Sequence, residues 1–178
     1  MCGIVGYIGH KDAQGILIGG LKRLEYRGYD SAGIALFHQG NIHFRKCAGK
    51  IKDLVTHIEE KPLPKTNMGI SHTRWATHGA ATDINAHPHL DCKNRIALVH
   101  NGIIENFQEL KTKLIKQGHR FKSATDTEII VHLIEKYYQG DFEQALRRAV
   151  AQLEGSFALG VISGDEPDKL FALRRFSP

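Results

Sequence analysis

Apolar residues recur along the chain at two spacings, one typical of strands and one typical of helices. Short apolar runs bounded by glycine or other turn residues predict strands over residues 2–8, 32–38, 41–46, 68–73, 95–100, 156–163 and 169–174. Gln39-Gly40 separates two of these runs and is typical of a tight hairpin turn. The early and late strands therefore flank a largely helical middle.

Apolar residues at helical spacing predict five helices between the strands. Their inward faces carry Ile16, Leu17, Leu21 and Leu24; Ile51, Leu54, Val55 and Ile58; Phe107, Leu110 and Leu114; Ile130, Leu133, Ile134 and Tyr137; and Phe142, Ala145, Leu146, Ala149 and Leu153. Asp12 and Asp141 are suitable N-caps, and Thr125 with Glu128 fits a capping box. Gly118 is a suitable helix stop.

This order of elements predicts one α+β layered domain over residues 1–178, without an internal repeat or a linker. The chain stops at Ser177-Pro178, directly after the last predicted strand. We therefore expect the domain to be incomplete at its C-terminal end.

Composition narrows the class of protein. Apolar residues make up 42% and charged residues 24% of the chain, which is ordinary for a soluble globular protein. No apolar run approaches the length of a membrane span, and the apolar start lacks a basic leader, so we expect a cytoplasmic protein with no membrane partner. The net charge of +5 is spread along the chain, which argues against a nucleic-acid partner.

The three cysteines, Cys2, Cys47 and Cys92, form no C-x-x-C pair, and their odd number predicts free thiols in a reducing compartment. His87 and His89 lie close to Cys92 in sequence and raise the question of a metal. No H-E-x-x-H or paired C-x-x-C motif accompanies them, so we predict no metal site.

Cys2 is the first candidate for chemistry. Removal of Met1 would give a cysteine with a free α-amino group, whose ordinary pKa of about 7.7–8.0 is close to the thiol value of about 8.5. Such an amine can act as the base for its own thiol. Taken alone, however, a cysteine that merely begins a buried strand is the more common finding.

Six motifs, taken together in their order and spacing, favour a catalytic role for Cys2 over a purely structural one. They are Met1–Gly6, Arg23–Gly33, His72–Gly79, Asn85–His89, Val99–Asn106 and Thr125–Glu128. Together they resemble the glutaminase domain of the glutamine–fructose-6-phosphate aminotransferases, which are class II glutamine amidotransferases and N-terminal nucleophile hydrolases. The resemblance covers the whole chain and implies a four-layer α-β-β-α sandwich with two antiparallel sheets.

The resemblance also assigns catalytic roles. Cys2 would attack the side-chain amide of glutamine, and Asn101 with the backbone N–H of Gly102 would form the oxyanion hole. A side-chain amide and a glycine N–H can both donate to a developing O⁻, and glycine allows close approach of the backbone. From the residues alone, Asn101-Gly102 could equally be a turn.

Substrate-binding roles follow from the same resemblance. Arg74 would hold the α-carboxylate of glutamine and Asp126 its α-ammonium group, while Thr77 and His78 line the pocket and Trp75 sits in a covering loop. A planar guanidinium suits a carboxylate. On residue type alone, Asp126 could instead favour a helix start, and Trp75 could be a core residue.

One departure from the family is visible, because this chain reads Ala80-Ala81 where the family usually carries a proline. The missing φ constraint predicts a looser covering loop.

The resemblance implies no cofactor and L-glutamine as the substrate. Fructose 6-phosphate would bind only to sugar-isomerase domains absent from this chain, and the full enzyme would be a homo-oligomer. The alternatives are the glutaminase domain of another class II amidotransferase or an inactive glutamine-binding module. Arg27–Asp30 and Arg74–Thr77 favour the sugar enzyme.

Overall fold

The computed structural model describes residues 2–177, which form two four-stranded antiparallel sheets. The first sheet has the order β1 (Gly3–Ile8), β4 (Met68–Arg74), β2 (Ser31–His38) and β3 (Asn41–Ala48). The second has the order β5 (His89–Leu90), β6 (Ile96–Ile104), β7 (Gly155–Ser163) and β8 (Leu170–Arg175). Each sheet is therefore built from one continuous half of the chain.

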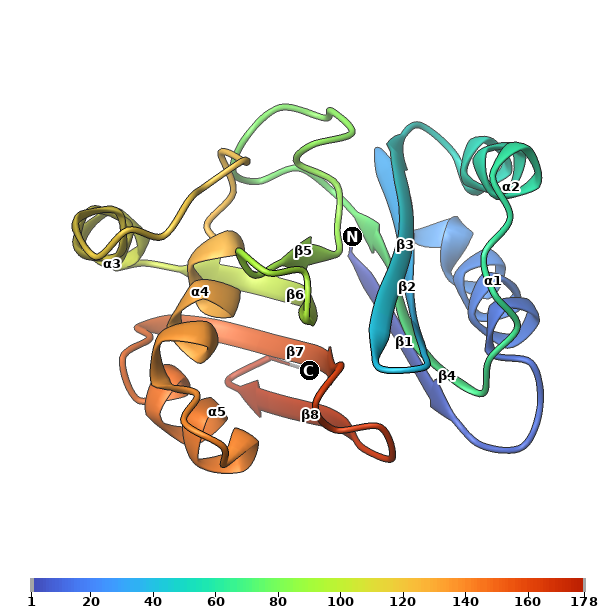
Figure 1. Ribbon diagram of the computed structural model, residues 1–178. Coiled ribbons are helices and arrows are strands. Elements are labelled where there is room, and N and C mark those ends of the chain that lie inside the picture. Colours follow the sequence, from blue (N-terminus) through green and yellow to red (C-terminus); the bar gives the residue numbers. More distant parts are fainter. Residues whose placement is uncertain (1, 178) are drawn as a thin grey trace.

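The helices lie on the outer faces of the two sheets, as Figure 1 shows. The first sheet is covered by α1 (Ala13–Leu24), which continues into the 3-10 turn η1 (Glu25–Arg27), and by α2 (Ile51–Glu60). The second sheet is covered by α3 (Phe107–Lys116), α4 (Glu128–Tyr137) and α5 (Phe142–Val150). These layers confirm the predicted α-β-β-α sandwich. Within residues 2–177, no helix is both long and apolar enough to cross a membrane.

Alternation along the strands builds the core between the sheets. Met68 and Ile70 of β4 pack with Ala97 and Val99 of β6 in one buried cluster. The intervening residues of β6 face the helices, so that Leu98 belongs to the cluster shared with α3, α4 and α5. The period of two therefore sets which β6 side chains point toward the first sheet.

Several local predictions are confirmed. Gln39 and Gly40 both have positive φ, 48° and 77°, as a tight hairpin between β2 and β3 requires. The side chain of Asp141 accepts a hydrogen bond of 2.9 Å from the backbone N–H of Gln144 at the start of α5. Gly118 follows α3 with φ 93°.

Two predicted helix caps are wrong. Helix α4 begins after Thr127 without a side-chain cap, and the Glu128 carboxylate instead accepts backbone N–H bonds from Lys122 (2.8 Å) and Ser123 (2.6 Å). The predicted Thr125–Glu128 capping box therefore does not form. Asp12 does not cap α1, because its carboxylate accepts instead from the N–H of Thr66.

The strand predicted over residues 95–100 is longer in the structure. Pairing with β7 extends β6 to Ile104, which lies opposite Gly155. Asn101-Gly102 is therefore part of a strand, and the alternative of a turn is wrong. The two-residue strand β5 is too short to leave a periodic signal and was not predicted.

Candidate functional site

A pocket of about 530 Å³ lies where the two halves of the chain meet. Seven of the eight predicted site residues line it, namely Cys2, Arg74, Trp75, Thr77, Asn101, Gly102 and Asp126. His78 does not line it, because its ring packs edge-on against Phe107 with the ring centroids 5.1 Å apart. The expected removal of Met1 concerns a residue outside the described part of the chain.

Strand pairing places Cys2 at the pocket. The register of β1 against β4 sets Gly3 opposite Thr73, so the residue before Gly3 lies beside the end of β4. There the backbone N–H of Trp75 donates to Sγ of Cys2 at 3.2 Å. The thiol is half-buried and lines the pocket. This arrangement holds the sulfur in one position while leaving it open to a ligand.

Asn101 continues the face of β6 that begins with Ala97 and Val99, and it points toward the first sheet. Nε2 of His72 lies 2.8 Å from its Oδ1. His72 is buried, and this burial lowers its pKa to about 3, so the ring is neutral. An amide oxygen only accepts, so Nε2 carries the ring proton and donates it. The Asn101 carbonyl is thereby fixed on His72, which leaves the Nδ2 donors to other partners.

The backbone at Gly102 does not accommodate a residue with a side chain. Its φ is 126°, a value that L side chains rarely adopt. A Cβ at this position would lie 2.0 Å from the carbonyl oxygen of Ser156 on the neighbouring strand. Glycine is therefore required both by conformation and by the close approach of β7.

Arg74 ends β4, and its guanidinium organises the loop that follows. Its Nη atoms donate to the carbonyls of His78, Gly79 (3.0 Å) and Ala80 (3.4 Å). Nδ2 of Asn85 also donates to the Ala80 carbonyl, at 3.0 Å. These bonds hold the segment that lacks the family's proline. The predicted looseness of this loop stays a prediction.

Asp126 joins the end of β6 to the start of α4. Its Oδ2 accepts a hydrogen bond of 2.9 Å from the backbone N–H of Ile104. The residue is 4% exposed, and it faces the pocket. Burial lowers the pKa of Arg74, while the negative charges of Asp30 and, to a smaller extent, Asp126 act in the opposite direction. The pocket thus presents a cation and an anion that can meet the two charges of an amino acid.

Trp75 and Thr77 lie in the loop after β4. Trp75 is 54% exposed, so the alternative of a core residue is wrong. An exposed indole at the rim of a pocket is suited to contact a ligand or a neighbouring segment.

Sequence reasoning assigned no role to seven other residues that line the pocket, namely Arg27, His87, His100, Ile103, Thr127, Ser156 and Ser177. The histidines among them pack together: His87 stacks on His72 with ring centroids 4.2 Å apart. Nδ1 of His100 lies 2.8 Å from Oγ1 of Thr127. Their contacts join residues far apart in sequence and leave no local signal, although five of the seven fall inside the motifs quoted above; Ser156 and Ser177 do not.

The chain is similar to glutamine amidotransferases. A family model described as the glutamine amidotransferase domain matches residues 72–176. The glutamine–fructose-6-phosphate aminotransferase (isomerizing) of Pyrococcus horikoshii is 56% identical over 180 residues, and that of Clostridium acetobutylicum is 52% identical over 178 residues. Both alignments cover 100% of this chain but only 30% and 29% of those relatives.

Solved structures agree with the fold. The glutamine phosphoribosylpyrophosphate amidotransferase of B. subtilis, solved with ADP and GMP, is 28% identical and superposes with a TM-score of 0.79. That match covers 92% of this chain and 35% of the other. A structure described as the allosteric regulatory enzyme of purine biosynthesis is 29% identical, with a TM-score of 0.80, over 92% of this chain and 36% of the other.

Proposed function

Because the chain belongs to the glutamine amidotransferase domain family, we propose that its pocket hydrolyses the side-chain amide of L-glutamine with Cys2 as the nucleophile. The observation that carries the proposal is that a half-buried thiol, an oriented amide and a glycine with positive φ share one pocket with Arg74 and Asp126. These groups can supply a nucleophile, oxyanion donors and a clamp for an amino acid.

In the proposed first step, Sγ of Cys2 attacks the side-chain carbonyl carbon of glutamine. The α-amino group exposed by removal of Met1 takes the thiol proton. Nδ2 of Asn101 and the N–H of Gly102 donate to the oxyanion that forms. The C–N bond then breaks as the amine returns the proton to nitrogen, which releases ammonia and leaves a γ-glutamyl thioester.

In the second step, water attacks the thioester and the sulfur leaves. The same amine takes a proton from the water and returns it to the thiolate, so the products are glutamate and ammonia. Asn101 and Gly102 serve this second oxyanion as well, because the acyl carbon keeps its place.

We propose that the two charged side chains fix the substrate. Arg74 binds the α-carboxylate, and Asp126 accepts from the α-ammonium group. Thr77 lines the same pocket, and Trp75 covers it. His78 acts through its backbone, since its carbonyl accepts from Arg74 while its ring packs on Phe107.

The chain spans about a third of the length of the relatives it matches. We propose that in the full protein the ammonia aminates fructose 6-phosphate to give glucosamine 6-phosphate, in a homo-oligomeric enzyme of the cytoplasm. The identities of 56% and 52% to enzymes named for that reaction support this choice over other class II amidotransferases.

The test is hydrolysis of glutamine by the purified chain and by Cys2→Ala. Turnover should fall more than about a hundredfold, because removal of a catalytic nucleophile costs far more than that. Cys47→Ala is the matched control, since its buried thiol lies outside the pocket, and it should keep normal turnover.

A diazo-ketone analogue of glutamine gives a second measure. Mass spectrometry should find it attached to Cys2 in the parent chain. Labelling of Cys92 instead, or glutamine binding without labelling or hydrolysis, would support the inactive-module alternative and overturn the proposal.

A further inference from the structure

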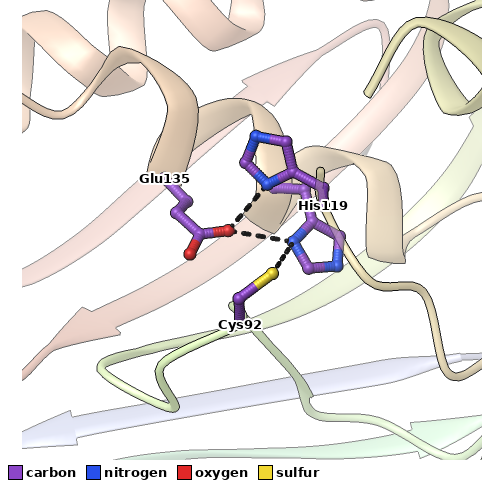
Figure 2. A group of neighbouring side chains, drawn as sticks. Cys92, His119 and Glu135 are labelled. Atoms are coloured by element: carbon purple, nitrogen blue, oxygen red, sulfur yellow. Dashed lines mark hydrogen bonds and ion pairs between the residues drawn. The ribbon is translucent and has the colours of Figure 1, made fainter. Parts of the chain in front are cut away.

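The structure brings four metal-ligand side chains together outside the pocket: Cys92, His119, His132 and Glu135. Cys92 lies in the turn between β5 and β6, His119 follows α3, and the other two lie on α4. Figure 2 shows the sulfur, the imidazole and the carboxylate converging from these segments. One ligand atom from each lies within 4.8 Å of all the others, and no second group of this kind occurs in residues 2–177.

The separations within this cluster are close to those of a zinc site. Sγ of Cys92 lies 3.7 Å from Nδ1 of His132. Oε2 of Glu135 lies 3.2 Å from that nitrogen and 2.8 Å from Nδ1 of His119. Bonds of about 2.0–2.3 Å in a tetrahedral Zn²⁺ site place neighbouring ligand atoms roughly 3.3–3.7 Å apart. Small side-chain movements would therefore admit the ion.

The ring of His132 has a carboxylate near each of its two nitrogens. Oε1 of the buried Glu128 lies 3.7 Å from its Nε2. Nε2 is buried and has no hydrogen-bond partner within residues 2–177, while the Glu128 carboxylate accepts from the backbone N–H groups of Lys122 and Ser123. Metal-binding histidines commonly have a carboxylate near the ring nitrogen that does not bind the metal, and Glu128 lies on that side of His132. Nδ1 faces Sγ of Cys92 and Oε2 of Glu135, so it is the ring nitrogen placed to bind a cation.

We propose that Cys92, His119, His132 and Glu135 bind one Zn²⁺ ion. Four protein ligands complete the tetrahedral shell, which is typical of a structural site, and two imidazoles with a thiolate and a carboxylate suit zinc. Binding displaces the thiol proton and the proton shared within the cluster into solvent, with no change of oxidation state.

The ion would join three segments, namely the turn before β6, the residues after α3, and helix α4. Helix α4 begins just after Asp126 and Thr127, which line the pocket. Zinc would therefore stabilise one wall of the pocket without entering the chemistry.

This inference departs from the prediction of no metal. In the sequence, the potential metal ligands nearest to Cys92 on its N-terminal side include His87 and His89. In the structure His89 instead bonds Thr125, with Nε2 3.0 Å from Oγ1, and His87 stacks on His72. The ligands that join Cys92 come from later in the chain.

The test uses the 178-residue chain with Cys2→Ala, so that Cys92 is its one accessible cysteine, since Cys47 is buried. Zinc is titrated against a competing chelator, and cobalt is used as a spectroscopic probe. We expect one equivalent of zinc, a thiolate-to-cobalt charge-transfer band, and a melting temperature that rises with zinc.

The variants Cys92→Ser and Glu135→Gln keep the shape of the cluster but remove a ligand. Each should weaken zinc binding by more than roughly 100-fold, since loss of even an outer-sphere partner costs 10–100-fold. His43→Ala, outside the cluster but in the His38–His43 pair, is the matched control and should bind as the parent does. Failure of the parent to bind one equivalent, or equal affinity in the parent and Cys92→Ser, would overturn the proposal.

Discussion

Nε2 of His72 lies 2.8 Å from Oδ1 of Asn101, and this contact joins the two sheets at the pocket. The contact follows from the alternation of side chains along the strands. His72 lies on the same face of β4 as Met68 and Ile70, and Asn101 lies on the same face of β6 as Ala97 and Val99. The apolar layer between the sheets thus ends in a polar pair that orients the proposed oxyanion donor.

His72 is therefore a positioning residue, and His72→Phe tests this role. Phenylalanine keeps a ring against His87 but removes the donor to Asn101. We expect turnover to fall about tenfold with KM nearly unchanged, less than the 10²–10³-fold cost of losing an oxyanion donor outright. His72→Gln retains a donor and should recover part of the loss. Unchanged turnover in His72→Phe, measured on a folded sample, would show that Asn101 needs no such support.

The Gly102→Ala variant should be less stable to unfolding than the parent chain and should not hydrolyse glutamine. The new Cβ would collide with the Ser156 carbonyl, and the positive φ alone costs about 1–3 kcal/mol. Gly118→Ala is the matched control, because Gly118 also has positive φ, 93°, but nothing lies within 4 Å of its Cβ position. Urea unfolding should therefore show a larger loss for Gly102→Ala; equal losses would mean that the collision is relieved elsewhere.

Arg74→Lys and Asn101→Ala should separate binding from turnover. A lysine offers a point charge in place of a planar fork, so Arg74→Lys should mainly raise KM for glutamine. Asn101→Ala should instead lower kcat by about 10²–10³-fold. Steady-state kinetics on both variants decide the matter, and the reverse pattern would contradict the proposed roles.

Stability should fall as the pH drops below about 6.5, the ordinary pKa of histidine. Burial lowers the pKa of His72 to about 3 and that of His100 to about 4, so both take up a proton on unfolding between these values and 6.5. The free energy of unfolding is thus highest above pH 6.5. Each histidine contributes a loss of up to about 1.4 kcal/mol per pH unit below it.

Urea unfolding at pH 7.5, 6.5 and 5.5 measures this loss. The lowered pKa of Glu128, about 2, contributes only below its ordinary value of 4.5, so the interval above pH 5 isolates the histidines. A free energy of unfolding that stays flat across that interval would contradict neutral, buried histidines.

The sequence was a good guide to elements and a poor guide to long-range side-chain contacts. Repeated burial on one face leaves a periodic signal, so all five helices and seven of the eight strands were predicted near their observed places. Glu128 was misjudged because its carboxylate bonds the preceding loop, a choice made by tertiary packing. The pairing of Cys92 with His132, 40 residues later, has no local pattern at all.

The candidate site was predicted by family motifs, and chemistry alone would not have found it. From its residues alone, Asn101-Gly102 could be a turn, and only its pairing with β7 identifies it as part of a strand. His72 lies in one of the quoted motifs, but its contact with Asn101 depends on how the two sheets pack together and has no signal in the sequence.

The division of the sheets between the two halves of the chain means that a single cut could separate the reacting groups. Residues 80–84 are exposed and join the halves. One piece would carry Cys2 and Arg74 with the whole of the first sheet, and the other would carry Asn101, Gly102 and Asp126 with the whole of the second. Neither piece would contain the whole candidate site. Hydrolysis regained on mixing them would report the docking of two half-molecules, which makes this domain a candidate for fragment complementation.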